Sequence, residues 1–322
     1  VLVEVIVRFA FFGKKHEGPP SDRPRYYFED AKADTLQDYA YSKIKPTNTF
    51  RIAVVGDSYT FAPYMQFTDA FPKILERMLN IGGTSKKTEV INYGVPAYST
   101  SHEVPVVEKA IKEGADLILL QITLNDPEIK PYRPIGITHF NTFGELEFAG
   151  WELALSKYWK TYALIRTRLY NAKTRKDYAK TFLDLFENPK TWKNFADSVT
   201  KINEITKSSS VPIKAVVFPL FGLPLDDNYP FMPCHNKAGD LLKQLDIPTL
   251  DLFETYKGQP LERMQVIPGK DRHPNEIAHR MAAEKIYDWL EETKSFPEDL
   301  AIKKKFKKRT QIIKEEPFVV TQ

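Results

Sequence analysis

The chain has 322 residues, of which 42% are apolar and 27% are charged. These figures fit one large or two modest globular domains, and they exclude a disordered or fibrous chain. A single cysteine, Cys234, excludes an internal disulfide framework and a thiolate zinc cluster. None of the six histidines has the spacing of a zinc site. No run reaches the length of about eighteen apolar residues that a membrane span needs.

The formal net charge of +4 is concentrated at the C-terminus. Residues 301–322 hold seven basic and two acidic residues, a net charge of +5, which leaves −1 for the other 300 residues. A nearly neutral body does not favour a nucleic-acid-binding face, so we expect no nucleic acid as partner. The basic tail alone could contact a membrane surface, a protein assembly or, as the weaker alternative, a nucleic acid, or it could be a solvated, mobile end.

The N-terminal segment, residues 1–12, is apolar except for Glu4 and Arg8. Twelve residues are too few to cross a bilayer. We interpret the segment as the remnant of an anchor or signal, as an amphipathic helix, or as an edge strand. The first interpretation predicts an exported or membrane-anchored protein with its folded domain outside the cytoplasm. Prolines and glycine within residues 18–24 break regular structure after it.

From residue 50 onward, short apolar runs alternate with helical periodicity. Five runs are predicted as buried strands, at residues 50–55, 89–92, 116–124, 213–218 and 248–253. Helical spacing is found at residues 71–79, 103–113 and 277–290. This alternation predicts an α/β fold in which helices cover both faces of a mostly parallel, five-stranded sheet.

Residues 126–200 interrupt the alternation, since they contain no run of the buried-strand type. They hold 14 of the 41 aromatic residues. We predict an insertion that begins with a hairpin at 136–148 and continues as helices. Most of its aromatic side chains are expected to pack in a core, and a few to form a wall or lid over the site.

Polar residues follow several predicted strands, and in a parallel sheet the carboxyl ends of the strands meet at one edge. Gly56-Asp57-Ser58 follows the first strand, Asn92-Tyr93-Gly94 the second and Asn125-Asp126 the third. A further group, Asp271-Arg272-His273-Pro274-Asn275, precedes the last helix.

These residue types suit a serine hydrolase. A serine hydroxyl becomes a nucleophile when a neighbouring base takes its proton, and Ser58 and His273 fit these roles. Asp271 could orient His273 and stabilise its imidazolium form. The tetrahedral intermediate needs hydrogen-bond donors at its oxyanion. The Ser58 amide, the Gly94 amide and the Asn125 side chain could supply them.

The four groups, in this order, resemble the motifs of the SGNH hydrolases, also called the GDSL family of esterases and lipases. The resemblance covers about residues 50–291, with residues 126–200 outside the common core. It implies a three-layer, flavodoxin-like α/β/α sandwich that uses Ser58, His273 and Asp271 as catalytic residues. It implies Ser58, Gly94 and Asn125 as the oxyanion hole, and neither a metal nor an organic cofactor.

Three positions depart from the family pattern. Tyr59 replaces the family's leucine, and Thr123 stands where a glycine is frequent. Asp271 lies two residues before His273, whereas the family's acid lies three before its histidine. A backbone carbonyl could orient His273 instead. Arg272 could bind an anionic substrate, although a solvated arginine is the simpler expectation.

The sequence therefore predicts an N-terminal extension at 1–49, a hydrolase domain at 50–300 and a basic tail at 301–322. The expected activity is cleavage of a small acyl ester, of the O-acetyl type, on a carbohydrate or lipid. An O-acyltransferase would need the same residues. The alternative from another class is an inactive binding or scaffold subunit of a larger assembly, which the short spacing between Asp271 and His273 would suit.

Overall fold

The computed structural model describes residues 2–11, 38–81, 86–129, 150–268 and 271–297. Its centre is a five-stranded parallel sheet with the order β2-β1-β3-β4-β5. The strands are β1 (Thr49–Gly56), β2 (Lys87–Gly94), β3 (Leu117–Ile122), β4 (Ile213–Val217) and β5 (Thr249–Asp251). Each overlaps a run predicted as a strand, so the predicted sheet is confirmed.

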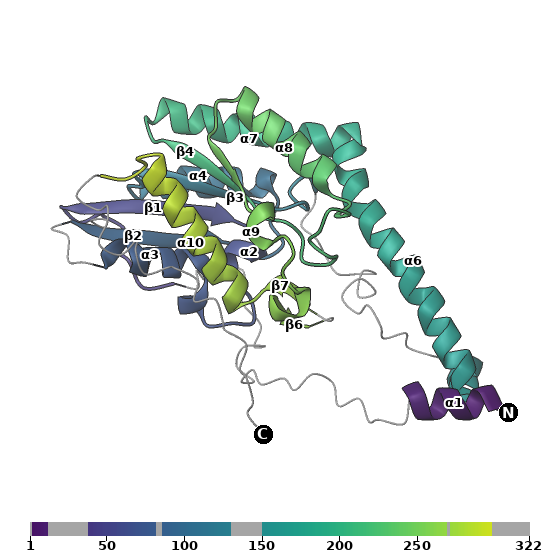
Figure 1. Ribbon diagram of the computed structural model, residues 1–322. Coiled ribbons are helices and arrows are strands. Elements are labelled where there is room, and N and C mark those ends of the chain that lie inside the picture. Colours follow the sequence, from purple (N-terminus) through teal and green to yellow (C-terminus); the bar gives the residue numbers. More distant parts are fainter. Residues whose placement is uncertain (1, 12–37, 82–85, 130–149, 269–270, 298–322) are drawn as a thin grey trace, which may run out of the picture.

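Helices cover both faces of the sheet, as predicted for a three-layer α/β/α sandwich (Figure 1). On one face α3 (Phe71–Asn80) packs against α10 (Glu276–Glu292), and on the other α4 (Thr100–Lys112) packs against α7 (Pro189–Ser208). Next to α7 lies α8 (Met232–Gln244). Every residue of β1 from Arg51 to Gly56 is buried, as expected for a central strand covered on both sides.

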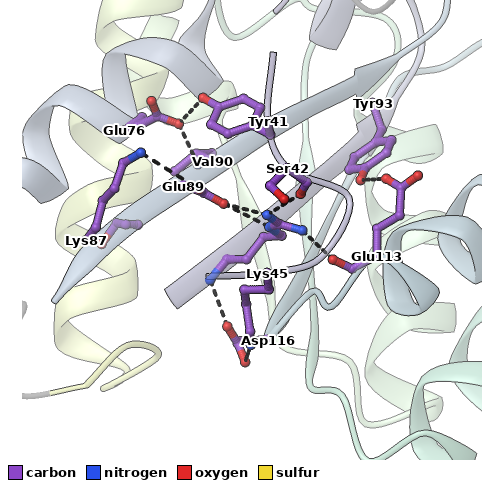
Figure 2. A network of polar contacts seen from close by, with 12 residues as sticks. Tyr41, Ser42, Lys45, Glu76, Lys87, Glu89, Val90, Tyr93, Glu113 and Asp116 are labelled. Carbon is purple, nitrogen blue, oxygen red and sulfur yellow. Dashed lines mark hydrogen bonds and ion pairs between the residues drawn. The ribbon is translucent and has the colours of Figure 1, made fainter. Parts of the chain in front are cut away.

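A buried ion pair lies inside this sheet. Arg51 on β1 is 1% exposed and donates two hydrogen bonds to Glu89 Oε2 on β2, at 3.0 and 2.7 Å. Its remaining donors contact the carbonyl oxygens of Ser42 and Glu113. Figure 2 shows this network, which also includes the bond between Lys45 and Asp116. A buried charge is tolerated only when its hydrogen bonds are made, and here they tie the segment before β1 to the sheet.

The described part of the interval between β3 and β4 is mostly helical, apart from residues 123–129 and 209–212. It contains α5 (Gly150–Tyr158), α6 (Lys160–Glu187) and the whole of α7. The predicted hairpin at 136–148 lies outside the described residues, as does the basic tail at 301–322. Several aromatic side chains, among them Phe186 and Phe195, join the main core as expected.

The N-terminal segment is a helix, α1 (Leu2–Phe11), which packs on α6 rather than on an edge of the sheet. Of the three interpretations, the edge strand is therefore wrong. In the part of the chain that the structure describes, no helix combines the length and the apolar character required to traverse a bilayer.

Candidate active site

Ser58 is the first residue of a short helix, α2 (Ser58–Phe61), which begins directly after β1. Asp57 caps this helix, since its Oδ1 accepts a hydrogen bond from the Tyr59 amide at 2.8 Å. Gln121 on β3 accepts a hydrogen bond from the Asp57 amide at 3.1 Å. A Cβ on Gly56 would lie 2.3 Å from the same Gln121 oxygen, so only glycine fits there. The strand-to-helix turn thereby presents Ser58 at the carboxyl end of β1.

The last motif lies on a strand that sequence reasoning did not predict. Residues Asp271–Pro274 form β7, which pairs with β6 (Gln265–Ile267) as an antiparallel hairpin before α10. In a strand, residues two apart point to the same side. Asp271 Oδ1 therefore reaches His273 Nδ1 at 2.7 Å and also accepts from the His273 amide at 2.9 Å.

The hairpin places this pair against the nucleophile turn. His273 Nε2 lies 3.0 Å from Ser58 Oγ. Burial lowers the pKa of His273, but the charge and hydrogen bond of Asp271 outweigh burial, and the pKa is raised above 6.5. Burial raises the pKa of Asp271, and the opposing effect of His273 leaves it below 3.8. Asp271 is thus an ionised partner of the histidine.

Aromatic rings surround the imidazole. The Tyr59 ring lies edge-on to His273, with centroids 5.8 Å apart, and it also packs edge-on against Phe218 at 5.8 Å. The Tyr64 ring lies 6.5 Å from His273. The departure from leucine at position 59 therefore places an aromatic ring in contact with His273.

Arg272 lies between the two site residues of β7. The sequence predicts a solvated side chain, but in the structure Arg272 packs against an aromatic ring. Its guanidinium carbon lies 5.1 Å from the ring centre of Tyr178 on α6, and it also interacts with the Tyr178 hydroxyl. Burial raises the pKa of Tyr178 to about 12, although Arg272 opposes the shift. Tyr178 is itself buried against Phe182 and Phe231. The inserted helix is therefore in direct contact with the strand that carries His273.

Gly94 has a different role from the predicted one. Its amide donates to Asn92 Oδ1 at 2.9 Å, so in this structure it is not presented to a substrate oxygen. A Cβ at this position would lie 2.3 Å from the Phe61 amide nitrogen, so Gly94 allows β2 to approach α2. Three residues later, Ala97 has a left-handed backbone with φ of 64°. We find no acceptor for its amide among the described residues.

The predicted oxyanion residue Asn125 follows β3. It lies close to the loop that contains Tyr98 and to the turn that begins at Asp57. Its Nδ2 donates to the carbonyl oxygen of Tyr98 at 3.5 Å, a long contact, and its side chain also interacts with Asp57. Asn125 is therefore placed beside the nucleophile turn and beside the loop that contains Ala97.

A buried pair of carboxyl groups lies behind Asn125. Asp126 and Glu103 on α4 are both 0% exposed. Asp126 Oδ2 accepts a hydrogen bond from the Thr123 amide at 2.6 Å, whereas no partner is found for the Glu103 carboxyl among the described residues. Burial raises the pKa of Glu103 well above 4.5, and the charge of Asp126 adds to the shift. No sequence signal identified Glu103, because the pattern of α4 predicts only a surface helix.

His279 lies on α10, after the last motif, and its side chain packs in the core. Its Nδ1 accepts from the Phe71 amide at 3.1 Å and its ring stacks on Phe71. Burial lowers its pKa to about 3. In the described ranges, no three histidine, cysteine, aspartate or glutamate side chains are arranged so that they could hold a metal ion.

Comparison with solved structures finds similar folds at low sequence identity. An acetyl xylan esterase, AlAXEase, is 12% identical over 75% of this chain and 100% of its own, with a TM-score of 0.47. An acetylxylan esterase from Geobacillus stearothermophilus is 10% identical over 81% of this chain and 98% of its own, with a TM-score of 0.47. A protein described as lipolytic and of the G-D-S-L family, from Desulfitobacterium hafniense, is 11% identical over 74% of this chain and 98% of its own, with a TM-score of 0.44.

In fold, the chain is similar to the GDSL-type hydrolases. These likenesses concern the fold alone. No family model matches the sequence. No curated protein matches it either.

Proposed function

We propose that this protein is a serine hydrolase that cleaves acyl esters. The observation that carries the proposal is the continuous chain of contacts from Asp271 through His273 to Ser58, at 2.7 and 3.0 Å. The three groups have the order and reach that nucleophilic catalysis requires. Neither a metal nor a cofactor is needed for this chemistry.

In the proposed reaction, Ser58 Oγ attacks the ester carbonyl carbon while His273 Nε2 takes the hydroxyl proton. Asp271 holds the imidazole in orientation and stabilises its protonated form. His273 then donates the proton to the departing alcohol. A water molecule attacks the acyl-enzyme, again with His273 as base, and releases the carboxylic acid and free Ser58.

The developing oxyanion needs donors in fixed positions. We propose the Ser58 amide and the Asn125 side chain, as expected from the motifs. In place of Gly94, whose amide is bonded to Asn92, the Ala97 amide is the third candidate, because its loop contacts Asn125 through Tyr98. The left-handed backbone at Ala97 is the type of strained geometry that functional loops retain.

The short spacing between Asp271 and His273 no longer supports an inactive scaffold, because β7 brings both side chains to one side. An O-acyltransferase would use the same groups and differ in the acceptor that reaches the acyl-enzyme. The resemblance to the SGNH hydrolases and the aromatic-rich insertion support a small acyl group of the O-acetyl type on a carbohydrate or lipid as the proposed substrate.

A fluorophosphonate probe tests the proposal directly. We expect labelling of the wild-type protein, loss of labelling in Ser58→Ala, and unchanged labelling in Ser208→Ala, where an exposed serine is removed. Hydrolysis of p-nitrophenyl acetate, butyrate and octanoate would then rank acyl lengths. Release of acetylated glycerol in the presence of glycerol would reveal acyl transfer. A folded wild-type protein that neither reacts with the probe nor turns over any ester would contradict the proposal.

A further inference from the structure

Exposed apolar side chains gather at the end of α6 that lies far from the sheet. We call this region, made of α1, α5 and residues 159–169, the α1–α6 tip. It contains nine of the fourteen large apolar side chains that are exposed in the described part of the chain. The most prominent are Val3, Ile6, Trp151, Tyr158, Trp159 and Leu169. In Figure 1, α6 extends away from the α/β core, and α1 lies across its far end.

The tip is held together by specific polar contacts. The Glu4 carboxylate accepts hydrogen bonds from the amides of Lys160 and Thr161, at 2.7 and 2.9 Å, and so caps the N-terminus of α6. Burial opposes ionisation, but these hydrogen bonds lower the pKa of Glu4 to about 2. Arg8 pairs with Glu4 at 2.9 Å and donates to the carbonyl oxygen of Tyr158.

These contacts fix which face of α1 is covered. Val7 is buried against its neighbours, whereas Val3 and Ile6 remain exposed. The apolar surface therefore belongs to a defined arrangement of three helices. An exposed apolar patch of this kind marks an interaction surface.

The charge of the tip identifies the kind of partner. Residues 2–11 and 150–169 contain five basic and two acidic residues, a net charge of +3. Both acids are engaged, since Glu4 pairs with Arg8 and Glu152 pairs with Arg166 at 3.0 Å. Lys157 and Arg168 are exposed beside the apolar side chains. The tip thus presents an excess of unneutralised positive charge.

Tryptophan and tyrosine between apolar and basic residues form the composition of a helix that lies in a membrane interface. A second copy of the chain is disfavoured as occupant because two tips of net positive charge repel each other. We propose that the α1–α6 tip binds the surface of a bilayer that contains anionic lipid. Trp151, Tyr158 and Trp159 enter the headgroup region, and the basic side chains contact the headgroups.

This proposal is independent of the catalytic role of Ser58. It also differs from binding through the basic tail, whose seven basic residues lie at 301–322. Along α6, Tyr178 lies nine residues beyond Leu169, the last residue of the tip, which corresponds to about 13 Å of helix. The contact with Arg272 is therefore well separated from the tip, so tip variants leave the site unchanged.

The experiment is a flotation assay with the full chain and two kinds of vesicle, phosphatidylcholine alone and phosphatidylcholine with phosphatidylglycerol. We expect binding to the anionic vesicles and a blue shift of tryptophan emission. Trp151→Gln with Tyr158→Gln should weaken binding at least about tenfold, because two interfacial aromatic residues are lost. Lys157→Gln with Arg168→Gln should weaken binding to anionic vesicles roughly ten- to thirtyfold.

Matched control variants change exposed residues elsewhere. Ile44→Gln with Ile277→Gln removes two exposed apolar side chains, and Lys190→Gln with Lys243→Gln removes two exposed charges. Both should bind as wild type does. The proposal is overturned if the wild-type protein binds neither kind of vesicle. It is also overturned if the tip variants bind as tightly as wild type and wild-type tryptophan emission does not shift, a result that would assign binding to the basic tail. If light scattering showed a wild-type dimer that becomes a monomer in the tip variants, and no vesicle binding occurred, the tip would be a self-association surface instead.

Discussion

The Nε2 atom of His273 lies 3.0 Å from Ser58 Oγ, although 215 residues separate the two in the sequence. The contact joins the first strand-to-helix turn of the sheet to a hairpin outside it. Asp271 orients the imidazole through Nδ1, and the rings of Tyr59 and Tyr64 contact it edge-on.

The state of His273 predicts the pH dependence of activity. The base must be neutral, and its pKa is raised above 6.5, so kcat/KM should increase with pH through a pKa higher than 6.5 and then level off. Asp271→Asn removes the charge that raises this pKa. The rising limb should move to lower pH, and kcat should fall by about 10²- to 10⁴-fold.

A pH–rate profile of p-nitrophenyl acetate hydrolysis measures both effects. Asp240→Asn, an exposed substitution on α8, is the control and should leave the profile unchanged. If Asp271→Asn retained the wild-type limb, a group other than Asp271 would set the pKa of the histidine.

The contact between Arg272 and Tyr178 predicts an effect of the inserted helix on catalysis. Arg272→Gln removes the cation from the ring and frees β7 to shift relative to Ser58. A displacement on the order of 1 Å can lower a rate by about 100-fold, so we expect kcat to fall by about ten- to 100-fold. Arg280→Gln, an exposed arginine on α10, should have no effect.

Tyr178→Phe distinguishes the contribution of the ring from that of the hydroxyl, because it removes only the hydroxyl. It retains the stacking surface, and we expect kcat within about threefold of wild type because the cation–π contact persists. Steady-state kinetics on both variants, with circular dichroism as a check of folding, gives the answer. Wild-type kcat in Arg272→Gln would show that β7 is held without α6.

Glu103 predicts an unusual dependence of stability on pH. A carboxyl whose folded pKa lies above its unfolded value of 4.5 keeps its proton in the folded state and loses it on unfolding. Above pH 4.5 this group therefore costs stability, and the cost grows with pH until the folded pKa is reached. Glu103→Gln is neutral at every pH and removes the cost.

The free energy of unfolding of Glu103→Gln relative to wild type should thus increase with pH, by up to about 1.4 kcal/mol per pH unit. Urea unfolding at several pH values between 5 and 8 measures it. Glu108→Gln, an exposed neighbour on α4, should show no such trend. A constant difference for Glu103→Gln would mean that the buried carboxyl is ionised throughout.

Replacing Gly94 tests the close approach of β2 to α2, and replacing Gly239 is the control. In Gly94→Ala the new Cβ would lie 2.3 Å from the Phe61 amide nitrogen, so the nucleophile turn must move. We expect a loss of about 1–3 kcal/mol of stability, together with most of the activity. Gly239→Ala on α8 meets nothing within 4 Å and should stabilise the protein by about 0.5–1 kcal/mol. Thermal unfolding of both variants distinguishes the steric clash at Gly94 from the change in backbone entropy that any glycine-to-alanine substitution causes.

The sequence alone predicted the parts of the protein that depend on local pattern. The buried strands appear as apolar runs because both faces of a parallel sheet are covered. Ser58 and Asn125 could be chosen because strand ends in such a sheet meet at one edge, and His273 because its group precedes the last helix. The helical insertion followed from the absence of buried-strand runs in residues 126–200.

Tertiary structure decided what depends on partners distant in sequence. The spacing of Asp271 and His273 looked too short until β7 showed that alternate residues of a strand share a side. Gly94 looked like an oxyanion donor, but Asn92 takes its amide, and only the packing of β2 on α2 explains the glycine.

The same holds for the aromatic residues of the insertion. Composition could not separate Tyr178, buried against Arg272, from Trp151, exposed at the α1–α6 tip. Both lie in the aromatic-rich interval 126–200, and periodicity gives a residue's position around its own helix but not the element that covers it. The position of α6, which contacts the site at one end and carries α1 at the other, made that distinction.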